Sequence, residues 1–68
     1  MQANLAVFLN QRGYMSDNNL AWYFTRAAKE EGNSLSWNDA MDKVQDAKTW
    51  PIDNKTKTVA KKCYGVNL

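Results

Sequence analysis

Apolar residues recur along this chain at the three- and four-residue spacing of amphipathic helices, in four successive segments. The first segment runs from about residue 3 to residue 12 and places Leu5, Phe8 and Leu9 on one helical face. Gly13 follows it directly, in the position where glycine commonly ends a helix. The pattern therefore predicts a short first helix with an apolar face.

The second segment begins after Ser16 or Asp17, whose side chains can accept hydrogen bonds from the free backbone N–H groups of a first turn. It continues to about Glu31 and ends at Gly32-Asn33. Its predicted core face consists of Leu20, Phe24, Ala27 and Ala28, with Tyr23 at the margin. A second amphipathic helix is therefore predicted, joined to the first by a short loop.

The third segment shows the clearest helix signals. Ser36 is a natural N-cap, and Asp39 stands where a capping box has its second polar residue. The apolar positions that follow at helical spacing are Trp37, Ala40, Met41, Val44 and Ala47. Trp50-Pro51 closes the segment, because the residue before a proline is disfavoured in helical geometry.

A fourth helix is predicted from residue 53 or 54 to Tyr64, with Gly65 again in the terminating position. Ile52 and Val66 flank this segment and are expected to staple its two ends to the core. Between them lies a thin apolar stripe that consists of Val59, Ala60 and Cys63, flanked by Tyr64. Threonines within the segment lower its helix propensity, so its pattern is the weakest of the four.

Together the segments predict an all-α fold, a compact bundle of three to four short helices that forms a single domain over residues 1–68. The composition agrees, because 44% apolar residues and a net charge of +2 are typical of a folded chain rather than a disordered one. The expected core consists of Leu5, Phe8, Leu9, Leu20, Phe24, Trp37, Met41, Val44 and Val59.

Three adjacent aromatic residues, Trp22, Tyr23 and Phe24, cannot all face one side of a helix, since successive residues are about 100° apart. Phe24 joins the core face, and Trp22 falls opposite it, between Arg26 and Lys29. Either a second helix covers Trp22, or Trp22, Arg26 and Lys29 form a recognition surface. Tryptophan and arginine are enriched where binding energy concentrates, and an arginine can stack on an indole ring.

Charge is distributed unevenly along the chain. Residues 27–47 hold two lysines against five carboxylates, a net charge of −3. Residues 51–68 hold four lysines against one aspartate, a net charge of +3. In the third helix Asp39, Asp42 and Asp46 share one face, which either docks on a basic partner or is an ordinary solvated face.

The basic residues of the fourth segment are Lys55, Lys57, Lys61 and Lys62. In a helix, Lys55 and Lys62 lie on nearly one line, and the other two lysines form a second pair four residues apart. Such a face can follow the phosphates of a nucleic acid, mostly by backbone contact because no arginine is present to read guanine. The alternative is a solvated helix face.

Catalysis finds little support in this sequence. The chain has one cysteine, so it cannot form an internal disulfide, and it has no histidine, so it lacks the commonest general base. We expect no metal and no cofactor. Cys63 falls on the apolar stripe and is expected to be a small buried hydrophobe. The unpaired thiol suggests a reducing, cytosolic compartment. No stretch approaches the ~20 apolar residues that a membrane span needs.

The sequence therefore predicts a non-enzymatic cytosolic binding protein, a small regulator or adaptor. Another protein is the expected partner, contacted through Trp22, Arg26 and Lys29 and through the acidic face of the third helix. Nucleic-acid binding through the four lysines is the first alternative. The second is a self-associating structural module, in which the Trp22 face forms a homodimer interface and so compensates for a small core. No membrane contact is expected.

Overall fold

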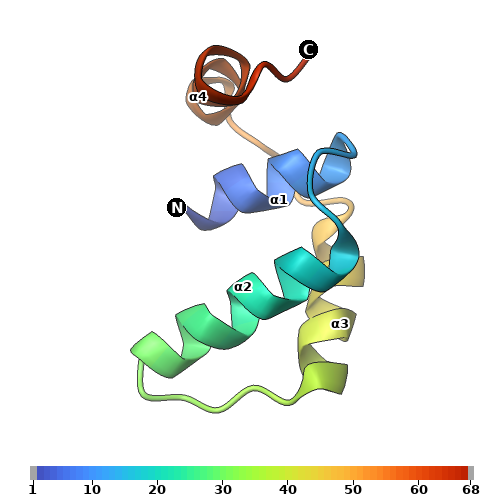
Figure 1. Cartoon of the computed structure of the whole chain (residues 1–68), viewed down its shortest axis with the longest axis vertical. Coiled ribbons are helices and arrows are strands. Elements are labelled where there is room, and N and C mark those ends of the chain that lie inside the picture. The colour runs from blue at the N-terminus through green and yellow to red at the C-terminus, as the bar shows by residue number, and fades with distance from the viewer. Residues whose placement is uncertain (1, 68) are drawn as a thin grey trace.

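The computed structural model describes residues 2–67, and these form four α-helices and no strand. In chain order the helices are α1 (Ala3–Gln11), α2 (Asp17–Glu30), α3 (Trp37–Ala47) and α4 (Asn54–Tyr64). α2 and α3 form a hairpin at one end of an elongated molecule, α4 lies at the other end, and α1 crosses between them (Figure 1). The predicted all-α fold is confirmed, including the fourth helix.

The helix ends follow the capping signals in the sequence. Ser16, Ser36 and Asp53 each accept, at a side-chain oxygen, a hydrogen bond from the backbone N–H three residues later, at 3.1, 3.1 and 2.8 Å. These bonds satisfy N–H groups that a first helical turn leaves free. α3 ends three residues before Trp50, because the N–H groups of residues 48–50 bond to carbonyls three rather than four residues back.

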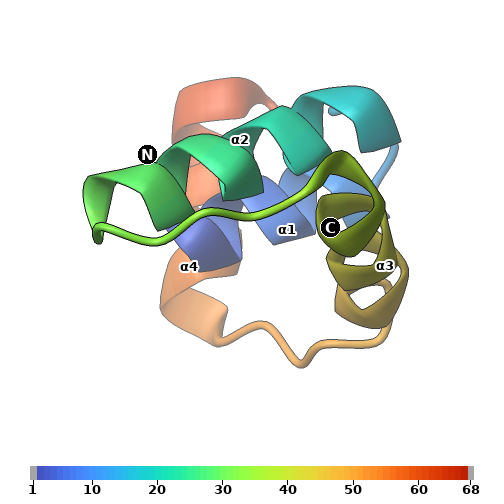
Figure 2. The same ribbon diagram turned by 90° about the horizontal axis from the view of Figure 1, so that it is seen from below.

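α1 is the central element of the fold because it is buried on two sides. All six residues at positions 5–10 are buried. Ala6 and Val7 pack on the α2–α3 hairpin, while the apolar face predicted from the sequence packs on α4. Figure 2 looks along the molecule from the hairpin end and shows α1 behind the hairpin and α4 behind α1. A helix that separates two layers in this way must be apolar around most of its circumference.

The core consequently has two parts, one on each side of α1. The first part, between α1 and the hairpin, consists of Ala6, Val7, Leu20, Ala21, Phe24, Ala40, Val44 and Ala47. The second part, between α1 and α4, consists of Leu5, Phe8, Leu9, Ala60 and Val66. Met15 and Ile52, both partly buried, pack against both parts, and Met41 packs at the edge of the first. Most of the predicted core residues, and both predicted staple residues, are therefore confirmed.

Two predicted core residues and the predicted buried cysteine lie at the surface instead. Trp37 is 40% exposed, because it is the first residue of α3 and lies at the end of the hairpin away from α1 (Figure 1). Val59 is 38% exposed and Cys63 is exposed, whereas Ala60 of the same predicted stripe is buried as expected, and Thr56 is buried with it. The buried face of α4 is therefore centred on Thr56 and Ala60, and the Val59 and Cys63 edge of the predicted stripe is turned toward solvent.

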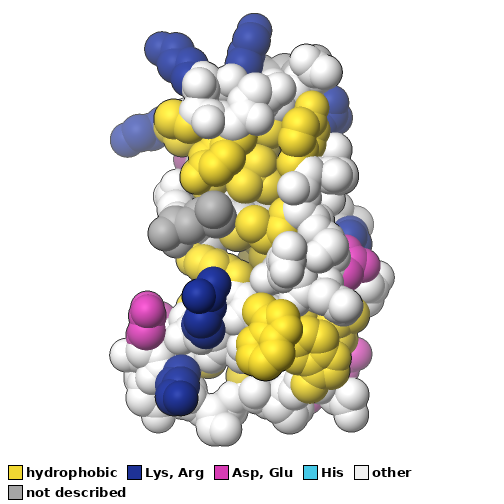
Figure 3. All heavy atoms as spheres, in the orientation of Figure 1, with side chains coloured by type: hydrophobic (Ala, Val, Ile, Leu, Met, Phe, Trp, Pro, Cys, Tyr) yellow, Lys and Arg dark blue, Asp and Glu magenta, His cyan; other side chains and the backbone are white. Residues whose placement is uncertain are grey.

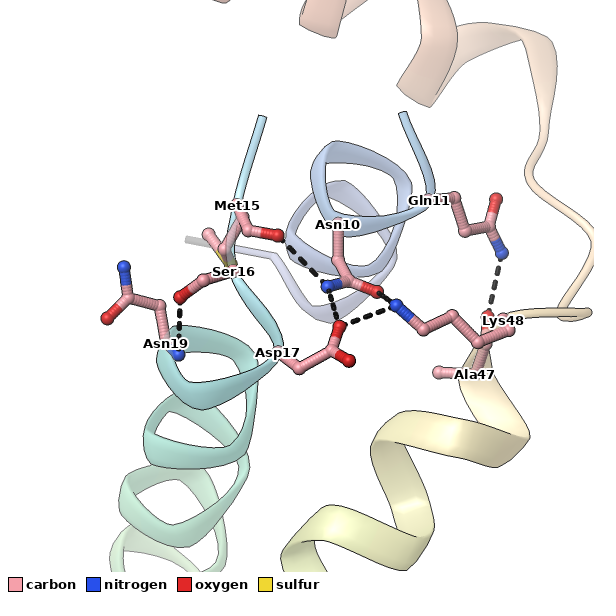
Figure 4. A network of polar contacts seen from close by, with 8 residues as sticks. All are labelled: Asn10, Gln11, Met15, Ser16, Asp17, Asn19, Ala47 and Lys48. Atoms are coloured by element: carbon pink, nitrogen blue, oxygen red, sulfur yellow. Dashed lines mark hydrogen bonds and ion pairs between the residues drawn. The ribbon is translucent and has the colours of Figure 1, made fainter. Parts of the chain in front are cut away.

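A buried amide connects three of the helices. Asn10 is 5% exposed, and its Nδ2 donates to the Met15 carbonyl at 3.0 Å and to Asp17 Oδ1 at 2.8 Å. Its Oδ1 accepts from Lys48 Nζ at 2.9 Å, and the same ammonium pairs with Asp17 (Figure 4). The neighbouring Gln11 donates to the carbonyl of Ala47, the last residue of α3, at 2.7 Å and to that of Trp50 at 3.0 Å. These bonds fix the start of α2 and the end of α3 against the end of α1.

Acid is expected to weaken this connection. Hydrogen bonds from Lys48 and Asn10 hold the pKa of Asp17 below its usual value of 3.8. Because the folded-state pKa is the lower one, the stabilisation is complete above about pH 4 and is lost as the pH falls through the folded-state pKa. We expect the urea midpoint, followed by circular dichroism, to decrease below about pH 4, and to decrease less in Asp17→Asn.

Asp53 supplies the control for this measurement. Hydrogen bonds from the Thr56 side chain and backbone lower its pKa as well, so it adds a separate loss of stability in acid. Asp53→Asn keeps an oxygen that can cap α4. It should remove the acid-dependent loss of stability that Asp53 contributes and leave the loss that Asp17 contributes unchanged. An Asp17→Asn variant with the same acid dependence as the unchanged protein would contradict the assignment.

Candidate functional site

Trp22 is the most exposed large hydrophobic residue within residues 2–67, at 59%. It lies on the side of α2 away from the core, and the Trp37 ring from the start of α3 lies against it. The two ring centroids are 5.3 Å apart and the planes are tilted by 56°, an arrangement in which aromatic rings attract each other. The sequence left open whether a helix covers Trp22. The structure leaves it exposed, with Trp37 as a partial shield.

The tryptophan pair, Trp22 and Trp37, forms an exposed hydrophobic patch over α2 and α3. Figure 3 shows two neighbouring ring systems in the lower half of the molecule, apart from a second hydrophobic area over α1 and α4. In this view basic side chains lie on one side of the rings with an acidic side chain next to them, and further acidic side chains lie at the edge of the molecule on the other side.

Trp22 and Arg26 form a ridge between two open hollows. The Tyr23 hollow has a volume of about 730 Å³, and its other lining residues are Met15, Asn19, Tyr23, Ala27 and Glu30. The Leu35 hollow has a volume of about 510 Å³, and its other lining residues are Thr25, Lys29, Asn33, Ser34 and Leu35. The ridge therefore presents two concave surfaces that a partner can enter from solvent.

The two cations of this surface, Arg26 on the ridge and Lys29 beside it, are available to a partner. Arg26 and Lys29 are exposed and make no hydrogen bond or ion pair within the part of the chain that the structure describes. The stacking of Arg26 on the Trp22 indole that the sequence suggested is not found among these residues, and the ring of Trp37 lies beside that indole in a tilted arrangement. Trp22, Arg26 and Lys29 nevertheless lie together, as predicted, since all three line the Leu35 hollow.

The acidic face of α3 is not part of this surface. Asp39, Asp42 and Asp46 are exposed, and their carboxylates make no ion pair within residues 2–67. They lie on the side of α3 opposite Trp37, because the helical positions of the three aspartates are about 140–200° away from that of Trp37. The two predicted protein-binding regions are therefore separate surfaces on opposite sides of α3.

The lysines of α4 lie at the far end of the molecule from the hairpin, where basic side chains fan out at the top of Figure 3. Lys55, Lys61 and Lys62 are exposed, and Lys57 is half-buried. Since α4 is a regular helix, Lys55 and Lys62 do lie on nearly one line, as the sequence predicted. The structure brings these four residues together on one element and keeps them apart from the tryptophan pair.

Three contributors to the surface were missed from the sequence. Trp37 was assigned to the core because it fits the apolar spacing of α3. Its position directly after the N-cap Ser36 was the available signal, since a first-turn residue at the end of a hairpin has few neighbours. Ser34 and Leu35 lie in a connection without periodicity, so nothing in the pattern pointed to them.

No protein-family model, curated protein or solved structure matches this chain. Within the described residues, no three His, Cys, Asp or Glu side chains gather in a way that suits a metal ion. In the same part of the chain, no helix is both long enough and apolar enough to cross a bilayer. The case for a function therefore depends on the geometry of the exposed surfaces.

Proposed function

We propose that the protein is a non-enzymatic regulator or adaptor of the cytosol that docks on another protein through the tryptophan pair and Arg26, with Lys29 at the edge of the contact. The observation that carries the proposal is the 59% exposure of Trp22 beside the 40% exposed Trp37. A chain of 68 residues has only a small core, and burial of a large indole would stabilise it. An indole that stays exposed is therefore available for contact with a partner.

The chemistry of the surface supports a protein as the partner. Tryptophan and arginine are the residues on which binding energy concentrates in protein interfaces, and here they stand next to each other on one ridge. Contact with Trp37 restricts the Trp22 ring before any partner arrives, which reduces the entropy lost on binding. The acidic face of α3 points away from this ridge, so in this proposal it is a separate surface rather than part of the same contact.

The proposal is tested by capture of partners on immobilised protein from the lysate of cells that express it. Trp22→Ala/Arg26→Ala is expected to retain less than about a tenth of what the unchanged protein retains, since loss of central interface residues commonly costs more than 2 kcal/mol. The matched control is Tyr64→Ala/Lys61→Ala, which removes an aromatic residue of 47% exposure and a cation from α4. Equal capture by both double variants would contradict the proposal.

Nucleic-acid binding is the second candidate, favoured by the exposure of Lys55, Lys61 and Lys62 on one regular helix. It requires an affinity for arbitrary duplex DNA that falls steeply as salt is added, because each neutralised phosphate releases counterions. A gel-shift titration at low salt measures this directly. The Tyr64→Ala/Lys61→Ala variant, rather than Trp22→Ala/Arg26→Ala, is then the one that loses binding.

A further inference from the structure

The Leu35 hollow suggests what kind of protein segment docks at the ridge. We infer, on the basis of the proposed function, that this hollow binds an extended acidic peptide segment of the partner, with an apolar side chain of the peptide seated between Trp22 and Leu35. Three properties of the hollow lead to this inference: the sign of its charges, its apolar floor, and the free backbone along one of its walls.

The charges of the Leu35 hollow are all of one sign. Arg26 and Lys29 are its charged lining residues, both are cations, and neither has a partner among residues 2–67. They lie three residues apart on α2 and therefore on the same side of the helix. The Tyr23 hollow on the other side of the ridge differs, because there Glu30 accompanies Arg26. A negatively charged segment is therefore directed to the Leu35 hollow rather than to its neighbour.

The floor and one wall of the hollow are apolar. Leu35 is partly buried and packs against the first part of the core, so it is held in place from below. Trp22 lines the hollow from α2, and its ring is supported by Trp37. An aliphatic or aromatic side chain inserted here would cover surface on Leu35 and Trp22 that now faces water. A site with only cations would suit any anion, but this floor adds a requirement for an apolar group.

The connection between α2 and α3 has backbone groups without partners among the described residues, at two residues that line the hollow. Its start is fixed, because the Asn33 N–H bonds to the Ala28 carbonyl at 2.9 Å, and its end is fixed by the N-cap Ser36, with φ −67° and ψ 159°. Between these points, the N–H and C=O groups of Ser34 and Leu35 make no hydrogen bond within the described residues. An extended peptide can pair with the N–H and C=O groups of one of these residues, as an added strand does with a residue at a sheet edge.

These three properties fit a peptide better than a nucleic acid. A phosphate backbone supplies acceptors but no N–H donors, so it would leave the free carbonyls of Ser34 and Leu35 without partners. It also gains less from the apolar floor than an aliphatic side chain does. The carboxylates of an acidic peptide can pair with Arg26 and Lys29, and one apolar side chain can pack on Leu35 and Trp22. The peptide backbone can hydrogen-bond to the connection between α2 and α3.

The test uses the whole protein, labelled with nitrogen-15, and a capped peptide of sequence Asp-Glu-Leu-Asp-Glu-Leu. We expect saturable NMR shifts of the Ser34 and Leu35 amides and of the Trp22 indole N–H. The peptide of opposite charge, Lys-Lys-Leu-Lys-Lys-Leu, is expected to leave these three NMR signals unshifted. In fluorescence anisotropy with the labelled acidic peptide, Arg26→Glu/Lys29→Glu should raise the Kd by at least about tenfold, and added salt should raise it further.

The matched control is Lys61→Glu/Lys62→Glu, which changes the net charge equally at the far end of the molecule and should leave the Kd within about twofold. Equal weakening by both double variants would overturn the inference, because it would show attraction by net charge alone. Shifts confined to α4, equal binding of the two peptides, or displacement of the acidic peptide by duplex DNA would overturn it too. If the peptide fails while Trp22→Ala/Arg26→Ala still abolishes capture from lysate, the inference falls and the proposed function stands.

Discussion

Replacement of Phe24 by alanine is expected to lower the free energy of unfolding by about 3–5 kcal/mol, a large part of the roughly 5–15 kcal/mol of a typical domain. Phe24 is 3% exposed and lies in the first part of the core. Its ring centroid is 6.1 Å from that of Trp50, and the Lys43 ammonium lies 4.7 Å above the ring. A small core has few other contacts to compensate for the cavity. Urea denaturation followed by circular dichroism measures the loss.

Trp22→Ala is the matched control for this experiment, because it removes a larger aromatic side chain two residues earlier on the same helix. Trp22 is 59% exposed, so its replacement should cost less than about 1 kcal/mol, mostly through lost contact with Trp37. Phe24→Leu keeps most of the buried volume and should fall between the two. If Trp22→Ala costs as much as Phe24→Ala, the indole is part of the core and the proposed docking surface does not exist.

Phe8→Ala is expected to lower the free energy of unfolding by a similar amount, about 3–5 kcal/mol, but to destabilise a different part of the molecule. Phe8 is 5% exposed in the second part of the core, where it packs with Ala60 and Val66. Among the described residues that part is the main apolar contact between α4 and α1, since the hairpin packs on the opposite side of α1. We therefore expect amide hydrogen exchange in Phe8→Ala to accelerate more in α4 than in α2 and α3, as partial opening of one unit predicts.

Val59→Ala separates the loss of a core contact from a general weakening of α4. Val59 lies on the same helix but is 38% exposed, so alanine there should change exchange rates in α4 by only a small factor. Alanine also has the higher helix propensity, which offsets part of the lost contact. Uniform acceleration over all four helices in Phe8→Ala would contradict the division of the core into two parts.

Local signals in the sequence predicted the helices well. Ser16, Ser36 and Asp53 cap the helices that follow them, and α4 ends at Gly65. Capping depends on hydrogen bonds between residues three apart, so the information is complete within one turn of chain. The same holds for the position of Trp22 on the side of the helix opposite Phe24, because that angle is fixed by helical geometry alone, whereas the sequence left open whether another helix covers Trp22.

Pairing between helices was less accessible to sequence analysis. The run of five apolar residues at positions 5–9 covers the whole circumference of α1, which is typical of a helix buried on two sides, but it does not show which helix packs on each side. For α4, helical spacing selects a stripe through Val59 but not the rotation of the helix about its axis. That rotation depends on how closely the small residues Thr56 and Ala60 approach α1, which is a property of the packed pair.

For the candidate site too, the residues of a single helix could be predicted from the sequence, and those that depend on helix pairing could not. Trp22, Arg26 and Lys29 share one side of one helix, and sequence analysis found all three. Trp37 and Leu35 reach the site from α3 and from the loop before it, so their contribution depends on how the hairpin closes. The separation of the acidic face from Trp37 was implicit in the helical spacing of α3. It became relevant only when Trp37 proved to be part of the surface.

The exposed thiol of Cys63 affects how self-association has to be measured. It stands on α4, at the opposite end of the molecule from the hairpin, so two copies can join there through an intermolecular disulfide without using the tryptophan pair. Such a covalent dimer doubles the mass in light scattering just as a homodimer formed by the Trp22 face does. Mass measurements therefore require a reductant or a Cys63→Ser variant. The same thiol offers a single attachment point for a maleimide dye or a solid support that leaves the ridge accessible.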